Sequence, residues 1–198
     1  IWALQIRSGE LWALPALGRG SWENVTPLAT PDCAEPDGHI ALLLGDDLEF
    51  GGAPLYLWVG RKQPGGNFAE RNGLTSGRLY AWASVSGERS PEDWHGTASA
   101  RDGVFRPLLV RAPELAGKPD HDRDGYLDDT TLRAQAVSVG AFMFSRPEDL
   151  ATNPRNQRQA VLCSTGHGAR YPADDWGTIY LVDVRFESAG DGLRPTAA

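Results

Sequence analysis

Leu55-Tyr56-Leu57-Trp58-Val59 is the clearest strand in the sequence, because leucine, aromatic and β-branched residues follow one another without a polar break. Ile179-Tyr180-Leu181-Val182-Asp183 has the same character. The full set of expected strands lies between turn signals, at 39–45, 54–60, 77–85, 104–110, 141–145, 159–164 and 178–186. One helix is expected, from about 130 to 139. These patterns predict an all-β protein.

The composition agrees with many short strands joined by turns. The 198 residues include 23 Gly and 14 Pro, and these separate short apolar runs along the whole chain. Such a chain suits a propeller, a barrel or a sandwich, and its length suits one domain or part of one. No internal repeat of fixed period is visible, so spacing alone does not single out the propeller.

Charge and hydropathy exclude two classes of function. The net charge is −7 and no basic patch offsets it, which argues against a nucleic-acid partner. No apolar run approaches the roughly 20 residues that a membrane-spanning helix needs, so no transmembrane segment is expected. Acidic residues concentrated in loops suit multivalent cations instead.

The two ends of the sequence differ in character. The chain opens on Ile1 without an initiator methionine or a signal peptide, and its first residues already have the pattern of a strand. We therefore expect a processed or truncated polypeptide. The last residues, 188–198, are rich in glycine and small residues and are expected to form a flexible tail after a domain at 1–187.

The segment 118–131 has the layout of a calcium loop. Ca²⁺ binds six to eight oxygens, which a loop supplies best from alternate positions followed by a glycine turn. Gly125 provides that turn, but Thr131 stands where an EF-hand has a glutamate, so a structural calcium site is expected rather than a sensor. A solvated acidic turn is the alternative. The expected calcium ligands are Asp120, Asp122, Asp124, Asp128 and the backbone carbonyl of Tyr126.

Carboxylates follow directly after several apolar runs. Asp46 and Asp47 follow Leu42-Leu43-Leu44-Gly45, and Glu148 follows Phe142-Met143-Phe144-Ser145 within three residues, while Glu23 precedes the β-prone Val25-Thr26. If these strand ends converge, their oxygens would form a binding site for a hard cation. Each acidic site is also explained by an ordinary strand-end turn or an ion pair. Cys33 and Cys163 permit one disulfide, which the sequence leaves undecided.

Several short motifs follow one another in order along the chain. They are Gly20-Ser21-Trp22-Glu23-Asn24-Val25, Gly45-Asp46-Asp47, Leu55-Tyr56-Leu57-Trp58-Val59-Gly60-Arg61-Lys62, Phe144-Ser145-Arg146-Pro147-Glu148-Asp149-Leu150, Cys163-Ser164-Thr165-Gly166 and Gly177-Thr178-Ile179-Tyr180-Leu181-Val182-Asp183. Together these motifs resemble those of the PhoX-like alkaline phosphatases, a family of exported bacterial β-propeller proteins. The resemblance runs from about residue 18 to residue 183.

The resemblance implies a fold, a location and cofactors. It implies a β-propeller with a metal cluster at one mouth of its channel, of which this chain would form only a part, about two to three four-stranded blades. It also implies export and the use of calcium and iron, although neither cysteine lies in a motif that matches an iron ligand, so iron stays unassigned. Glu23 and Glu148 are then the first metal-ligand candidates, and Asp46 and Asp47 are weaker ones. The remaining propeller, or identical copies, would cover the exposed sheet faces.

The activity that follows is hydrolysis of phosphate monoesters. Metal ions would neutralise phosphoryl oxygens and activate water. Arg146 or Lys62 would contact the phosphate, Arg through a bidentate fork and Lys as a point charge. An ion pair with Glu148 or Asp149 explains Arg146 equally well. The competing function is a non-catalytic, calcium-stabilised propeller scaffold that binds a partner or assembles into larger structures.

Overall fold

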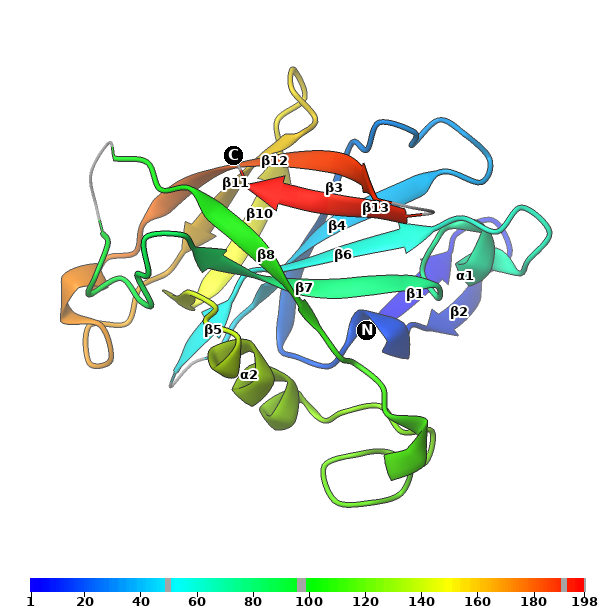
Figure 1. Cartoon of the computed structure of the whole chain (residues 1–198), viewed down its shortest axis with the longest axis horizontal. Helices are drawn as coiled ribbons and strands as arrows, with labels where there is room; N and C mark the ends of the chain where they lie inside the picture. The colour runs from blue at the N-terminus through cyan, green and yellow to red at the C-terminus, as the bar shows by residue number, and fades with distance from the viewer. Residues whose placement is uncertain (49–50, 96–98, 190–191, 198) are drawn as a thin grey trace.

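The computed structural model describes residues 1–48, 51–95, 99–189 and 192–197, and its regular secondary structure is mainly antiparallel β-sheet (Figure 1). An N-terminal hairpin pairs β1 (Trp2–Gln5) with β2 (Glu10–Ala13). The first large sheet has the order β3 (Trp22–Leu28), β4 (His39–Asp46), β6 (Tyr56–Arg61), β7 (Gly77–Ser84) and β8 (Gly103–Leu108). The second has the order β10 (Pro147–Thr152), β11 (Gln159–Ser164), β12 (Ile179–Ala189) and β13 (Gly192–Ala197).

The smaller elements connect these sheets. A two-stranded sheet pairs β5 (Gly52–Pro54) with β9 (Met143–Ser145). The two α-helices are α1 (Phe68–Arg71) and α2 (Asp129–Ser138). Short 3-10 turns are η1 (Pro15–Leu17), η2 (Pro113–Leu115) and η3 (Pro172–Asp174). Among the described residues, no helix is long and apolar enough to cross a membrane.

Strand β6 explains why the run at 55–59 is so apolar. It lies in the middle of the five-stranded sheet, and other elements pack on both of its faces. Leu57 and Val59 face the second sheet and join the core between the two sheets. Tyr56 and Trp58 face the opposite way and pack with Leu132 of α2. Side chains that alternate between two buried faces give a continuous apolar run rather than an alternating one.

The two large sheets lie against each other with corresponding edges matched. β10 lies against β3 and β4, and β13 lies against β8 and β6. Gly45 of β4 permits the close approach at one edge, because a Cβ there would lie 2.6 Å from the carbonyl oxygen of Pro147 and 2.8 Å from that of Glu148. The ends of β4 and β10 are thereby brought together.

Most strands expected from the sequence are present, as is the helix, but several strands were missed, among them β3, β5, β10 and β13. β3 and β10 contain prolines and charged residues, which mask the strand pattern. β13 lies in the segment expected to be a flexible tail. The prediction for 188–198 was wrong there, since β12 runs to Ala189 and pairs with β13 from Gly192 to Ala197. The first sheet also has five strands, where four-stranded blades were expected.

Candidate functional site

The candidate site lies where β4 ends and where β9 passes into β10. Between these strands, Arg146 adopts a left-handed backbone conformation, with φ of 56°. Its carbonyl oxygen accepts a hydrogen bond from the backbone N–H of Thr165 (3.0 Å), and that of Ser145 accepts one from Gly166 (3.1 Å). A non-glycine residue in this conformation is uncommon, and such residues concentrate at functional sites. The structure therefore marks Arg146 as a specifically positioned side chain.

Arg146 binds two of the predicted carboxylates. Its Nε and Nη2 atoms each lie 3.0 Å from one carboxylate oxygen of Asp47, and Nη2 also lies 2.7 Å from Oε1 of Glu148. The three side chains are only partly exposed, between 18% and 26%. A bidentate guanidinium–carboxylate pair fixes the plane of the guanidinium. The structure is therefore compatible with both interpretations of Arg146, an ion-pair partner and a phosphate ligand. Its guanidinium is paired with Glu148, and the residue is also held rigidly at an open strand end.

Asp46 has a different environment from Asp47. Its side chain is fully buried, and its two oxygens accept hydrogen bonds of 2.7 and 2.8 Å from Nε and Nη2 of Arg133 in α2. The backbone N–H of Ser21 donates a further bond of 2.7 Å. Hydrogen bonding to Asp46 raises the pKa of Arg133 above its ordinary value, against burial, which lowers it. Arg133 therefore stays charged, and its pair with Asp46 holds α2 against the sheet.

Arg133 is the residue that the sequence analysis missed. It also lies 2.8 Å from Asp129, four residues earlier on α2. That i,i+4 spacing of an acid and a base inside the expected helix was a usable signal for a helix-surface pair. Its contact with Asp46, 87 residues away, had no signal in the sequence.

Glu23 lies at an irregularity in the pairing of β3 with β4. The register shifts between Trp22 and Asn24, which face Asp46 and Gly45, and Glu23 is the extra residue and is exposed. Bulges of this kind redirect a side chain and are frequent beside active sites. The next residue, Asn24, donates a long hydrogen bond of 3.5 Å to Asp149 of β10. Glu23 and Glu148 therefore lie at the same end of the two sheets.

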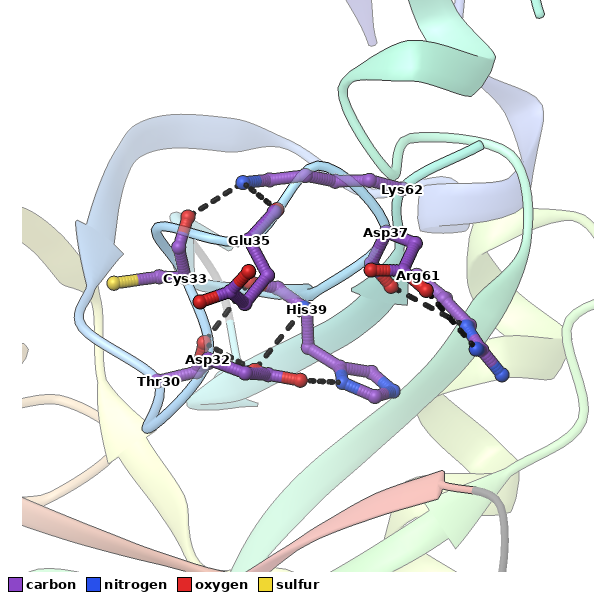
Figure 2. A network of polar contacts seen from close by, with 8 residues as sticks. All are labelled: Thr30, Asp32, Cys33, Glu35, Asp37, His39, Arg61 and Lys62. Carbon is purple, nitrogen blue, oxygen red and sulfur yellow. Dashed lines mark hydrogen bonds and ion pairs between the residues drawn. The ribbon is translucent and has the colours of Figure 1, made fainter. Parts of the chain in front are cut away.

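Lys62 lies at the other end of the first sheet and does not join this site. Its Nζ donates hydrogen bonds to the backbone carbonyls of Cys33 (2.5 Å) and Glu35 (3.2 Å), and it thereby holds the loop before β4 (Figure 2). Because His39 faces Arg61 across β4 and β6, the seven steps along β4 to Asp46 separate these ends by about 23 Å. Lys62 is therefore far from Arg146, and the expectation that Arg146 or Lys62 contacts a phosphate stays a prediction. Cys33 and Cys163 are free thiols.

The residues present fit a metal ion only in part. Among the described residues, no three His, Cys, Asp or Glu side chains gather closely enough to hold one. Asp46 is saturated by Arg133 and Ser21, and Asp47 is held at both oxygens by Arg146. Glu23 is exposed, and Glu148 uses one oxygen for Arg146. Of the four candidates, Glu23 and Glu148 are the two whose oxygens suit a cation at this end of the sheets.

The loop expected to bind calcium projects away from the sheets and leads into α2 (Figure 1). Asp122 forms an ion pair with Arg19 and accepts bonds of 2.9 Å from the backbone N–H groups of Asp124 and Tyr126. Burial raises the pKa of Asp122, but those N–H donors and Arg19 outweigh it and lower that pKa below its usual value. The turn is therefore held together by hydrogen bonds from its own backbone N–H groups to the Asp122 side chain.

The other residues of this loop have separate partners. Asp128 is the N-cap of α2 and accepts a bond of 2.7 Å from the backbone N–H of Thr131. Asp120 has a left-handed backbone with φ of 67°, and its carbonyl oxygen accepts a bond from Asp128. The carbonyl of Tyr126 accepts a bond of 2.9 Å from the N–H of Asp122. Calcium binding by these residues stays a prediction.

Asp124 offers the cleanest test of that prediction, because among the described residues its exposed carboxylate contacts only the neighbouring Arg123, at 3.3 Å. If the loop binds Ca²⁺ with the millimolar to submillimolar affinity typical of extracellular modules, 10 mM Ca²⁺ should stabilise the protein by about 1–3 kcal/mol. Thermal unfolding measures the gain. Asp124→Asn should abolish it and the exposed control Asp102→Asn should keep it. An equal shift in both variants, or no shift in the unmodified protein, contradicts calcium binding here.

The sheets and their packing define the class of protein as all-β, with the architecture of part of a β-propeller. No protein-family model and no curated protein matches the chain. Among solved structures, the fold is similar to that of Pseudomonas fluorescens PhoX in complex with vanadate, a transition-state analogue, with a TM-score of 0.57 and 21% sequence identity. The match covers 94% of this chain and 32% of that chain, so this chain spans about a third of the length of that PhoX structure. The predicted fold class is confirmed.

Proposed function

We propose that this chain forms part of an exported, metal-dependent phosphatase that hydrolyses phosphate monoesters. One observation carries the proposal: Arg146, Asp47 and Glu148 converge at a strand end, in a fold similar to that of a PhoX protein that binds a transition-state analogue. Calcium is the proposed cofactor, and iron rests on the family resemblance alone. The rest of a propeller, or further copies of this chain, would supply the remaining ligands.

Each residue of the site has a proposed role. Glu23 and Glu148 would hold a metal ion, which when bound supplies charge neutralisation and an activated water. Arg146 places a fixed positive charge where a phosphoryl group would lie, and its rigid backbone limits the reorganisation needed during reaction. Asp47 orients the guanidinium through two hydrogen bonds of 3.0 Å. Asp46 and Arg133 act indirectly. Their ion pair holds α2 against β4, the strand that directly precedes Asp47.

A second function, the non-catalytic scaffold, is favoured by one specific observation. Two of the four expected metal ligands, Asp46 and Asp47, are already neutralised by arginines. Buried or half-buried acids with such partners are common structural ion pairs. In a scaffold, the same contacts would fasten α2 and the second sheet to the first without any bound metal.

Hydrolysis of p-nitrophenyl phosphate by the full natural polypeptide distinguishes the two functions. We expect turnover in the presence of Ca²⁺, loss of turnover with a chelator, and inhibition by vanadate. The melting temperature, followed in parallel, shows whether the chelator unfolds the protein. A folded, metal-replete protein without turnover on aryl or alkyl phosphate esters would contradict the phosphatase and support the scaffold.

A further inference from the structure

A second polar region lies at the end of the first sheet opposite Glu148, and it surrounds a cavity of about 450 Å³. This volume falls within the range of small-molecule binding sites, roughly 300–1,000 Å³. Three arginines and a histidine contribute to its lining: Arg61, Arg78, Arg194 and His39. They come from β6, β7, β13 and β4, so strands of both large sheets form the cavity.

Strand periodicity directs three of these side chains toward the space between the sheets. Side chains two residues apart along a strand share a face. Arg61 is two residues from Val59, and Arg78 is two residues from Tyr80, both of which belong to the core between the sheets. His39 is likewise two residues from Ala41. At this end of the sheets, the apolar core is therefore followed by a set of basic residues. Further apolar residues at these positions would have closed the space between the sheets.

Two of the basic residues have carboxylate partners that fix them. Asp32 lies 2.7 Å from Nδ1 of His39 and also accepts a bond of 3.1 Å from the backbone N–H of His39 (Figure 2). Arg61 donates a bond of 3.4 Å to the carbonyl of Asp37 and lies 3.9 Å from its carboxylate. Lys62 fastens the loop that carries both acids. The cavity wall on this side is thus pre-organised.

Arg78 and Arg194 bring positive charge to the opposite wall. Within the described parts of the chain, neither forms an ion pair. Burial raises the pKa of the Tyr80 hydroxyl, while the charges of Arg78 and then Arg194 act to lower it, which places both guanidinium groups near that hydroxyl. Like charges held around one cavity repel one another, and a bound anion would relieve that repulsion.

We propose that this cavity binds a small organic phosphate, with its phosphoryl group between Arg78, Arg194 and Arg61 and its organic part against Tyr80 and Val59. Guanidinium groups recognise phosphate oxygens through paired N–H donors, and phosphate carries enough charge to offset several of them. The apolar residues of the lining and the cavity volume favour a ligand larger than inorganic phosphate. This site is separate from the one at Arg146 and does not depend on the phosphatase activity.

Calorimetric titration with phenylphosphonate, which a phosphatase cannot hydrolyse, tests the proposal on the full chain. Arg78→Gln and Arg194→Gln should each weaken binding by about tenfold or more, since each removes charge-assisted hydrogen bonds. Arg7→Gln, the same change in the exposed turn between β1 and β2, should leave the affinity within about twofold. Inorganic phosphate should bind more weakly than phenylphosphonate.

The other outcomes overturn the proposal. Absence of binding, or equal weakening by Arg7→Gln, would show that the cavity is not a specific site. Weakening by Arg146→Gln in place of the two cavity variants would assign the binding to the candidate phosphatase site instead. Equal affinity for inorganic phosphate would remove the organic part of the ligand from the proposal. Thermal melts of the variants check folding, which is expected to persist because Arg78 and Arg194 are exposed.

Discussion

Glu148→Gln is expected to lower the turnover of phosphate monoesters by about a hundredfold or more, with little loss of stability. The substitution keeps the size of the side chain but removes the formal charge that a cation at this strand end requires. It also removes one of the two carboxylates that hold Arg146. Because Glu148 and Arg146 are both partly exposed, the lost ion pair should cost no more than about 1 kcal/mol of folding free energy. Steady-state kinetics and thermal unfolding measure the two effects separately.

The chain offers a matched control for this experiment. Asp149→Asn makes the same change of charge at the next residue of β10, where the side chain is exposed and, among the described residues, accepts only a long bond from Asn24. Its turnover should stay within about twofold of the unmodified protein. Glu23→Gln should behave like Glu148→Gln. If all three variants retain full activity, Glu23 and Glu148 have no part in the reaction.

Arg133→Met is expected to destabilise the fold by about 3–5 kcal/mol, because it leaves the buried carboxylate of Asp46 without its partner. Asp46 is fully buried, and Arg133 makes two hydrogen bonds to it while also binding Asp129. Loss of this contact should loosen α2, whose Leu132 packs on the same core as Trp58. Chemical denaturation reports the free energy of unfolding.

A double-mutant cycle separates the pair from its surroundings. Asp46→Asn combined with Arg133→Met should recover part of the stability lost in either single variant, since no buried charge then remains unpaired. Arg123→Met is the control, because Arg123 is 93% exposed and should change stability by no more than about 0.5 kcal/mol. An effect of Arg133→Met as small as that of Arg123→Met would show that the buried pair does not hold α2.

The parts of the fold that could be predicted are those in which local pattern and tertiary environment agree. β6 is buried on both faces and therefore has a continuous apolar run, and α2 follows an Asp that caps it. β10 was missed because Pro147, Glu148 and Asp149 conceal a strand whose identity comes from pairing with β11. β13 was missed because its glycine, proline and small residues have weak strand propensity, and its pairing with β12 supplies the structure.

The candidate site was predictable in its members but not in their partners. The sequence placed Asp46, Asp47, Arg146 and Glu148 at strand ends, and the structure brings these ends together through the close approach at Gly45. The sequence did not distinguish Asp46 from Asp47. Adjacent residues of an extended chain face opposite sides, and only the packing of α2 buries Asp46. The position of Lys62 could not be predicted either, since the antiparallel pairing of β4 with β6 places it at the opposite end of the sheet from Arg146.

The central claim is that Glu23 and Glu148 bind a cation beside Arg146, and diffraction from crystals of the full natural polypeptide soaked in Ca²⁺ tests it most directly. Data collected at a wavelength where calcium scatters anomalously locate the ion without reference to its ligands. We predict a peak about 2.3–2.6 Å from a carboxylate oxygen of Glu23 and of Glu148. An Arg146 still bound to both Asp47 and Glu148, with no anomalous peak at this strand end in calcium-saturated crystals, would contradict the claim.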